Sequence, residues 1–349
     1  MADRKAAERL DAAVEDLMAH RARDPELPAE VTELLRIAAD LRDLPSADFK
    51  ARLAADLRAA AIPTFGPPLR TEVDIMARLA ELATPRLVAH DVRAGLADLP
   101  ELTMRFLAHC GHATVVLSRY ATDTPIWERH PAGDELLWVV AGALDVTTLT
   151  TEGPQHAAVE AGSLFVCRRG LWHWPRPRGE VSLLSLTPGE GTINSTAADP
   201  RTDPTLADRG GDVPDATPPA SAIVCDLPAA LRNLATVAIT RDTTESEANG
   251  AIREIGRLED RLLGVMRFSG TTPWERHPDG DELLHVLDGA VDVTVLTDDG
   301  PVDVAVPAGS LFVCPRGLWH RQTPRTAATV FFATPTATSE ASWADDPRR

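Results

Sequence analysis

Apolar residues in the first 85 positions recur every three or four residues, which is the spacing of an amphipathic helix. Four such stripes are separated by prolines or by a segment containing Pro and Gly, and they cover residues 10–18, 31–41, 49–57 and 73–82. The stripes carry no group of metal-binding or nucleophilic side chains. The pattern predicts an α-helical module over residues 1–85 that packs, dimerises or docks a protein partner.

The pattern changes from about residue 88 onwards. Short runs of β-branched and other apolar residues follow one another, separated by Gly, Pro and Asp, as is typical of β-strands joined by turns. Residues 188–221 are rich in Gly, Pro, Asp and Thr, which is typical of an extended linker, and strand-forming runs return at residue 223. The sequence therefore predicts a mainly β protein after the helical module.

The two β segments repeat one another. The sequence WERHPAGDE at 127–135 returns as WERHPDGDE at 274–282, and residues 161–173 return as residues 308–320. Equivalent residues are separated by the same distance in the sequence throughout, which is the separation of His130 and His277. Roughly two-thirds of the aligned positions are identical. Gene duplication produces such a repeat, and chance does not.

Each copy contains two carboxylates and two imidazoles at a spacing that suits a metal site. Glu128 and His130 are two residues apart, so on a strand both side chains point to the same face. Residues 131–134 are turn-forming, Glu135 then begins the next strand, and His173 returns on a later one. We predict that these four residues converge on one metal ion. The same is predicted of their counterparts, Glu275, His277, Glu282 and His320.

These residues resemble the first sequence motif of the cupin family. That motif has a His-x-His pair, a Glu a few residues later, and a Gly seven residues after the Glu. In the first copy His130, Glu135 and Gly142 match it. The matching residues of the second copy are His277, Glu282 and Gly289. Both copies depart from the motif at one position, because Glu128 or Glu275 stands where the family has its first His.

The second cupin motif follows in both copies. It consists of Gly, five residues, Pro-x-Gly, two residues and His. The second copy matches it fully with Gly309, Pro315, Gly317 and His320. The first copy matches it with Gly162, Gly170 and His173, but Arg168 stands in the place of the proline.

The resemblance implies a fold, a cofactor and a range of functions. It covers residues 88–190 and 223–336 and implies two tandem antiparallel β-barrels of the double-stranded β-helix kind, with a linker at 191–222 and a tail at 337–349. It also implies up to two divalent metal ions per chain, with Fe²⁺ favoured by the donor set and Mn²⁺, Ni²⁺ or Zn²⁺ as alternatives. The favoured function is a metal-dependent, oxygen-using dioxygenase acting on a small organic molecule. The alternatives are a cupin isomerase or lyase, and a non-enzymatic metal or ligand sensor whose helices dock a partner.

Glu128 and Glu275 are the candidate catalytic residues, as direct ligands, general bases or holders of a water molecule. His285 lies three residues after Glu282, so its side chain is expected on the other face of the strand, away from the metal. We expect it to be a structural residue. Because its counterpart is Trp138, and because Arg168 replaces a motif proline, the second copy is slightly favoured as the active one.

Other residues near the motifs have structural interpretations. The tryptophans next to the ligands in the sequence are expected to pack behind the ligand side chains and hold them in place. They are Trp127, Trp172, Trp274 and Trp319. Arg129 and Arg276 should point away from the metal, whereas Arg169 and Arg316 are candidates to meet an anionic substrate. Ligation by the short tract His109 to His112 is not favoured, because the second copy lacks it.

The net charge, the apolar runs and the cysteine spacing limit the binding partners and the cellular location that are expected for the protein. The formal net charge of −17 argues against binding to nucleic acid or to an anionic membrane surface. No apolar run reaches the length of a membrane span, and the charged N-terminus does not resemble a signal peptide, so a cytoplasmic location is expected. The four cysteines form no CxxC pair and are expected to be free thiols.

Overall fold

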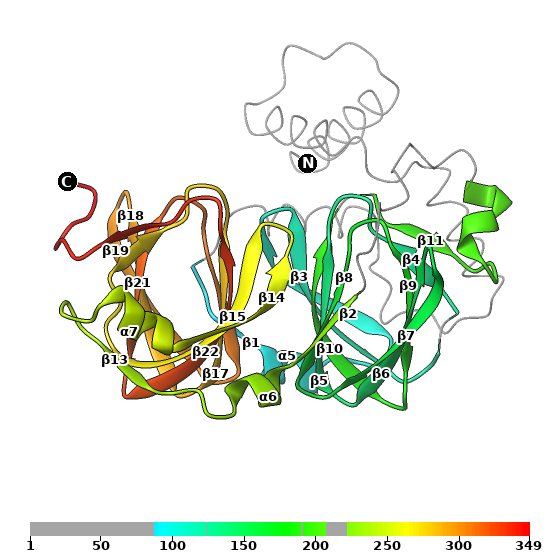
Figure 1. The fold of residues 1–349 in the computed structure, drawn as a ribbon, viewed down its shortest axis with the longest axis horizontal. Coiled ribbons are helices and arrows are strands. Elements are labelled where there is room, and N and C mark those ends of the chain that lie inside the picture. The colour runs from blue at the N-terminus through cyan, green and yellow to red at the C-terminus, as the bar shows by residue number, and fades with distance from the viewer. Residues whose placement is uncertain (1–86, 124, 190, 207–221) are drawn as a thin grey trace, which may run out of the picture. The chain divides into compact units, whose positions relative to one another are not determined.

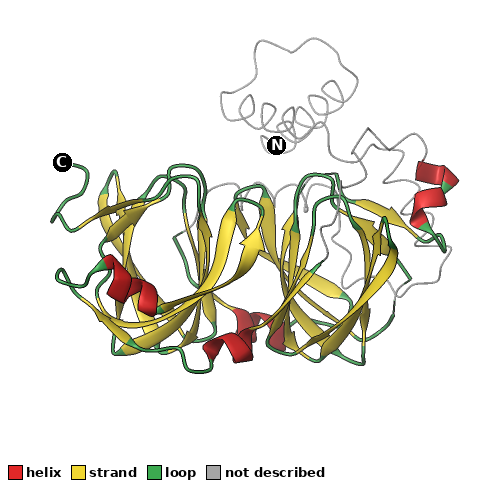
Figure 2. Cartoon of the chain, viewed as in Figure 1, coloured by secondary structure: helices red, strands yellow, loops and turns green. Residues whose placement is uncertain are grey.

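The computed structural model describes residues 87–123, 125–189, 191–206 and 222–349. The predicted helical module over residues 1–85 lies outside this part of the chain. The described residues are mainly β, as predicted, and their strands form four sheets that are arranged as two barrels (Figure 1). Figure 2 shows that the few short helices lie on the outside of the barrel walls.

The first barrel consists of two sheets. The six-stranded sheet contains β2 (Thr103–Cys110), β3 (Ala113–Tyr120), β5 (Glu135–Ala141), β8 (Ser163–Cys167), β10 (Val181–Pro188) and β12 (Ile223–Asp226). The five-stranded sheet contains β4 (Trp127–Arg129), β6 (Ala143–Thr150), β7 (Gly153–Glu160), β9 (Trp172–Pro177) and β11 (Ile193–Ser195). All described strand pairs of the first barrel are antiparallel.

The second barrel repeats this arrangement. The seven-stranded sheet contains β1 (His90–Asp91), β13 (Val237–Ile239), β14 (Ile252–Leu258), β15 (Arg261–Gly270), β17 (Glu282–Asp288), β20 (Ser310–Cys314) and β22 (Ala327–Pro335). The five-stranded sheet contains β16 (Trp274–Arg276), β18 (Ala290–Thr297), β19 (Gly300–Pro307), β21 (Trp319–Pro324) and β23 (Glu340–Ser342). Only β13 pairs in parallel, with β15, among the described strands.

The two barrels exchange their leading strands. β1 precedes the first barrel in the chain but pairs with β20 of the second, and β12 precedes the second barrel but pairs with β8 of the first. A short helix follows each exchanged strand, α5 (Val92–Ala97) and α6 (Leu227–Leu231), and each begins at a capping aspartate. A third helix, α7 (Glu245–Gly250), and two 3-10 turns, Pro200–Thr202 and Pro204–Leu206, complete the described elements.

Alternation along the strands divides most of the described apolar residues among three large cores, and Trp274, Leu296 and Trp319 form a small fourth cluster. Leu137, Phe165 and Leu183 lie in the core of the first barrel, and residues such as Phe312 lie in that of the second. The opposite faces of the same strands meet between the barrels, where Leu117, Leu184, Leu263 and Phe331 are fully buried or nearly so. Burial of this third core therefore holds the two barrels together.

Two stretches predicted to be a linker and a tail also contribute strands. The stretch 191–222 contains β11, which pairs with β4, and the tail 337–349 contains β23, which pairs with β16. The strands β11 and β23 therefore lie within the stretches predicted as linker and tail. Short strands with few apolar residues, such as Glu340–Ser342, give no hydrophobic pattern to detect.

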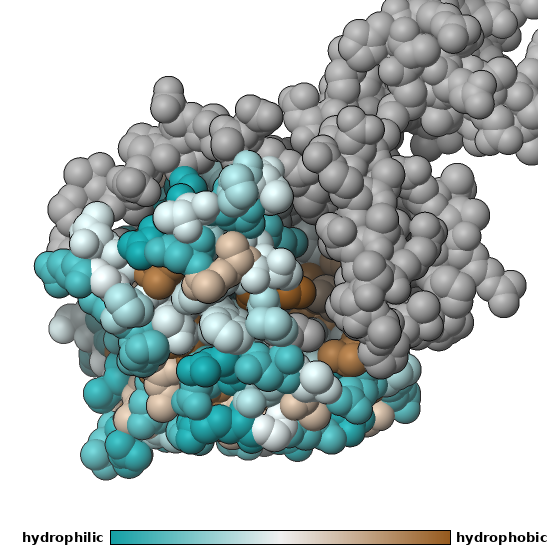
Figure 3. Space-filling model, turned by 90° about the vertical axis from the view of Figure 1, so that its right-hand side faces the viewer, coloured by the Kyte–Doolittle hydropathy of each residue, from teal (hydrophilic) through white to brown (hydrophobic). Residues whose placement is uncertain are grey.

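The described residues on the face seen in Figure 3 are mostly hydrophilic, with hydrophobic residues in small separate areas. Among the described residues the exposed large hydrophobic side chains are Val88, Met104, Val224 and Val302. No helix in the described part of the chain is long and apolar enough to span a membrane.

Candidate metal centres

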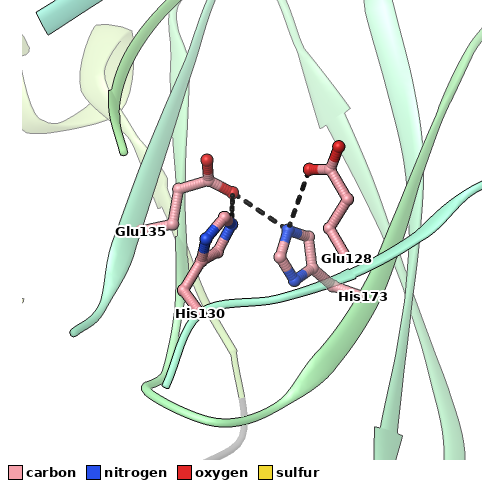
Figure 4. Close-up of side chains that lie close together, drawn as sticks. All are labelled: Glu128, His130, Glu135 and His173. Atoms are coloured by element: carbon pink, nitrogen blue, oxygen red, sulfur yellow. Dashed lines mark hydrogen bonds and ion pairs between the residues drawn. The ribbon is translucent and has the colours of Figure 1, made fainter. Parts of the chain in front are cut away.

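The first site is assembled by strand pairing across the barrel. Glu128 on β4 lies directly opposite His173 on β9, so both side chains project from the same face of the five-stranded sheet. His130 follows β4, and Glu135 begins β5 in the opposite sheet after the turn at 131–134. The predicted set of Glu128, His130, Glu135 and His173 does come together, with the four side chains pointing toward one another (Figure 4).

Glu135 is the centre of the first site. Its Oε2 atom lies 2.9 Å from His173 Nε2 and 3.4 Å from His130 Nε2. Glu128 Oε2 is 3.9 Å from His173 Nε2. One candidate ligand atom from each of the four residues lies within 4.8 Å of the other three. Glu135 and the histidines are almost wholly buried, but the Glu128 side chain keeps 37% exposure, so the site is open to solvent on that side.

The second site has a similar geometry, but its two histidines face different oxygens of the central glutamate. His320 Nε2 lies 2.9 Å from Glu282 Oε2, and His277 Nε2 lies 3.7 Å from Glu282 Oε1. Glu275 on β16 is opposite His320 on β21, as Glu128 is opposite His173. The structure therefore brings together all eight residues that the sequence suggested, in two groups of four.

A threonine behind each central glutamate completes the sites. Thr187 Oγ1 donates a hydrogen bond of 2.7 Å to Glu135 Oε1, and Thr334 Oγ1 donates to Glu282 Oε1 in the same way. Each hydrogen bond fixes the carboxylate so that its other oxygen faces His173 or His320. Sequence reasoning missed these threonines. Their spacing at the repeat offset was the available signal, but neither lies in a motif.

The turn before each central glutamate is anchored to the other barrel. Asp134 accepts a hydrogen bond from the backbone N–H of Arg169 at 2.7 Å and one from the backbone N–H of Glu259, in the second barrel, at 3.2 Å. Asp281 similarly accepts from the backbone N–H of Gly111, in the first barrel. Arg168, which replaces the motif proline, reaches both Asp134 and the backbone carbonyl of Arg257. This substitution therefore adds a contact between the barrels.

The two carboxylates of each site differ in proton affinity. Burial, followed by the charge of Glu135, raises the pKa of Glu128, and burial with the charge of Glu282 raises the pKa of Glu275 to about 7. Burial alone would also raise the pKa of Glu135 and Glu282. For these two the neighbouring histidines outweigh it, through charge and hydrogen bonds, and lower the pKa. Each site thus pairs a carboxylate whose pKa is lowered with one whose pKa is raised, Glu135 with Glu128 and Glu282 with Glu275.

The histidines opposite the central glutamates favour the protonated state in the absence of a cation. Burial alone would lower the pKa of His173 and His320. Contacts with a neighbouring cysteine, Cys167 or Cys314, and with the central glutamate instead raise it well above the usual value. The site therefore attracts positive charge at the position where a metal would lie.

Unpartnered nitrogens also fit a metal ion. His130 Nε2 and His277 Nε2 are buried, and each lies 3.4 or 3.7 Å from its central glutamate without the geometry of a hydrogen bond. Ligand atoms at the usual distance of about 2.0–2.2 Å from an ion are at most about 4.4 Å apart, close to the spacing found here. The mixture of imidazole and carboxylate suits Fe²⁺, Mn²⁺, Ni²⁺ or Zn²⁺.

The structure places the other candidate residues away from the ligands. His285 packs against Trp138 between the barrels, with ring centroids 4.8 Å apart, which confirms that it faces away from the metal site. Arg276 lies over the ring of Trp319 and pairs with Glu340, as expected of a residue on the outer face. The other three flanking tryptophans, Trp127, Trp172 and Trp274, are also buried in packing contacts.

Two further candidates lie in turns. His112 pairs with Glu259 of the second barrel at 3.2 Å, and neither His109 nor His112 belongs to a metal-type group among the described residues. Arg169 and Arg316, the candidates for binding an anionic substrate, each donate from Nε to the backbone carbonyl of a turn proline, Pro131 or Pro278. They therefore have a structural role in holding the two ends of the ligand loop together.

The fold and the sites define a protein with two antiparallel β-barrels and two His/Glu clusters of metal-binding type. Residues 264–332 match the family described as Cupin domain. The uncharacterized protein YdbB of Bacillus subtilis (strain 168) is 34% identical over 86 residues, which make up 24% of this chain and 70% of that protein. The chain belongs to the cupin family.

Solved structures of cupin proteins are also similar to this chain. A cupin 2 conserved barrel domain protein from Leptotrichia buccalis has 13% sequence identity and a TM-score of 0.45, with 72% of this chain and 99% of that chain covered. A single-residue variant of the oxalate decarboxylase of B. subtilis has 12% identity and a TM-score of 0.46, with 74% of this chain and 80% of that chain covered.

Proposed function

We propose that this protein is a metal-dependent cupin enzyme that acts on a small organic molecule, with dioxygen as co-substrate. The carrying observation is the convergence of two histidines and two glutamates in each barrel, with one glutamate open to solvent. Two histidines and one carboxylate form the ligand set of many oxygen-using Fe²⁺ enzymes. A second carboxylate makes the set richer in oxygen and keeps Mn²⁺ as the nearest alternative, ahead of Ni²⁺ and Zn²⁺.

The residues of the first site would have distinct roles. His130, Glu135 and His173 would hold the metal, and Thr187 would keep Glu135 in position. The metal, when bound, would supply Lewis-acid polarisation and a site for dioxygen. Glu128 is the open carboxylate with the raised pKa, so it is suited to take a proton from a substrate and return it. His277, Glu282, His320, Thr334 and Glu275 are the corresponding residues of the second site.

The test is oxygen consumption by the full-length chain. Protein loaded with Fe²⁺ or Mn²⁺ is mixed with a library of small organic molecules, and an oxygen electrode and mass spectrometry record uptake and products. The expected result is metal-dependent uptake with an oxygenated product, and loss of both in the double variant His173→Ala/His320→Ala. A product without oxygen uptake would instead indicate an isomerase or lyase. Metal and ligand binding with no product from any compound would indicate a sensor.

A further inference from the structure

The two barrels share their ligands but differ in the residues beside them. In the first barrel the strand registers place Asn194, Glu128, His173 and Thr148 in one row across β11, β4, β9 and β6. Directly paired residues project from the same face of a sheet. Asn194 and Thr148 therefore lie on the inward face, on either side of the ligands Glu128 and His173.

The corresponding row of the second barrel is apolar outside its ligands. There the registers align Ala341, Glu275, His320 and Val295 across β23, β16, β21 and β18. The positions that hold an amide and a hydroxyl in the first barrel thus hold two apolar side chains in the second. The ligand pair itself is unchanged.

The opposite wall shows the same change. Val181 and Ala328 are equivalent positions of the repeat. Val181 pairs with Tyr120 on β3 and Ala328 pairs with Phe268 on β15, so Tyr120 and Phe268 occupy equivalent positions. Both rings belong to the interior of their barrels. Phe268 is fully buried, whereas Tyr120 is only partly buried.

A second inward position on these strands differs in side-chain size between the barrels, and so changes the space left for a bound molecule. Ser185 on β10 is replaced on β22 by Phe332, which pairs with Gly264. A side chain on Gly264 would collide with the Phe332 ring, so this ring already lies against the wall of the second barrel. The interior of the first barrel has a small hydroxyl at the same place.

Two polar groups of the first barrel are available to a ligand. Asn194 Oδ1 is buried and has no hydrogen-bond partner among the described residues. Tyr120, the only tyrosine of the protein, lies near enough to the ligands that burial and the charges of Glu128 and Glu135 raise the pKa of its hydroxyl, which keeps it protonated. A buried polar group without a partner is costly, and a bound molecule with hydroxyl groups would remove that cost.

The charges indicate the chemical class of that molecule. None of the inward-facing positions on the described strands of the first barrel holds arginine or lysine. When Glu128 and Glu135 are both ionised, one divalent cation balances their charge and no fixed positive charge is left for an anion. Hydroxyl, phenol and amide groups can instead donate to and accept from a neutral polyol or another neutral hydroxyl compound.

We propose that the first barrel binds the substrate, that the substrate is a neutral, hydroxyl-bearing small molecule, and that Asn194, Thr148 and Tyr120 determine this specificity. The inference rests on the proposed function, because it assigns a substrate to a metal site of that function. The second barrel holds its metal beside the apolar side chains Val295 and Ala341, with Gln322 as the inward amide two residues along β21 from His320. We assign this barrel a stabilising role. This reverses the slight preference for the second barrel that the motif proline and His285 gave.

The test uses Mn²⁺ as a paramagnetic probe in the full-length chain. The variant His320→Ala/Glu282→Gln retains only the first site, and His173→Ala/Glu135→Gln retains only the second. Bound Mn²⁺ is measured first, and proton relaxation is then recorded for four probes: glycerol and D-xylose as neutral polyols, malonate as an anion and toluene as an apolar molecule. No turnover or dioxygen is needed.

The expected result is polyol relaxation at least about tenfold stronger with the first site than with the second, since several hydrogen bonds distinguish them. The triple variant Tyr120→Phe/Thr148→Val/Asn194→Ala copies the second barrel, so it should bind the same Mn²⁺ but lose the polyol effect. Thr147→Val is the matched control, because Thr147 lies next to Thr148 and hydrogen-bonds to His156 instead; it should retain the effect.

Four results would overturn the proposal: no polyol relaxation at the first site, equal relaxation at both sites, stronger relaxation of malonate or toluene, or an unchanged triple variant. Failure of both single-site variants to bind Mn²⁺ would contradict the proposed metal-dependent function itself. Mn²⁺ binding without the polyol effect contradicts only the present inference.

Discussion

The two barrels are nearly the same at their metal ligands and different on their walls. Glu135 and Glu282 each meet a histidine at 2.9 Å, and each is held by a threonine. Thr148 and Asn194 beside the first cluster nevertheless correspond to Val295 and Ala341 beside the second. The comparison teaches that a repeated ligand motif does not establish a repeated function. The chemistry that a metal site can perform also depends on the strands that surround it.

Removing one metal ligand from each barrel in turn should show the largest difference between the two barrels. His173→Ala should lower turnover about a thousandfold or more, because it removes a ligand from the substrate-binding barrel. His320→Ala should lower turnover by less than about tenfold, because its barrel has a structural role. The measurement is kcat/KM for the substrate found by oxygen uptake, with metal content determined for both variants. Equal losses in the two variants would contradict the difference between the barrels.

Trp138 tests the contact surface that the barrels share. Its buried ring packs on His285 and on Phe331, with ring centroids 4.8 and 4.9 Å away. Trp138→Ala should lower the free energy of unfolding by about 3–5 kcal/mol, because it leaves a cavity between the barrels. Denaturant titration measures the change, and Met104→Ala, at an exposed position, is the control. A loss below about 1 kcal/mol would contradict tight packing at this surface.

His285 makes the stability of the same surface dependent on pH. Burial lowers the pKa of His285 from 6.5 to about 4, so the folded protein favours the neutral ring. Its contribution is therefore fully present above pH 6.5 and is lost as the pH falls from 6.5 through 4. The expected loss at pH 4 is about 3 kcal/mol of unfolding free energy.

The variant His285→Phe isolates this term, because Phe cannot titrate and the metal ligands remain the same. The difference in unfolding free energy between the wild type and the variant should change by about 3 kcal/mol between about pH 7 and pH 4, in the direction that favours the variant at low pH. A difference that is independent of pH would show that His285 is not buried as a neutral ring.

The threonines that support the glutamates give the smallest expected effect. Thr187→Val removes the hydrogen bond to Glu135, and Thr334→Val removes the one to Glu282. Each should weaken metal binding in its own barrel by about 10- to 100-fold, as loss of a group behind a metal ligand usually does. Calorimetric titration of single-site proteins measures this effect. Similar losses in both barrels would sharpen the comparison, since they would show that the metal corners are equivalent and only the walls differ.

The metal corners could be predicted from the sequence because they depend on local spacing. Glu128 and His130 share a face through strand alternation, and the turn at 131–134 brings Glu135 back beside them. The cupin motifs then supported His173, which the spacing had already placed on a later strand. The constant repeat offset then gave the second site without further assumptions.

The rest depends on pairing between distant residues, which the sequence does not express. Asn194 lies opposite Glu128 only because β11 adds to the edge of β4, in a stretch whose composition indicated a linker. The exchange of β1 and β12 between the barrels likewise follows from the core that forms between them. Thr187 lies outside both motifs, and only the pairing of β10 with β5 brings it to Glu135.

Two metal ions, one bound by each cluster, are required by every role proposed above. The direct measurement is the metal content of the full-length chain after loading with Fe²⁺ or Mn²⁺ and removal of excess, by mass spectrometry of the elements. We predict about two ions per chain for the wild type, about one for Glu135→Ala or Glu282→Ala, and none for the double variant, from the four-ligand geometry of each site. A wild-type chain without stoichiometric metal, or a double variant that still holds two ions, would contradict the account.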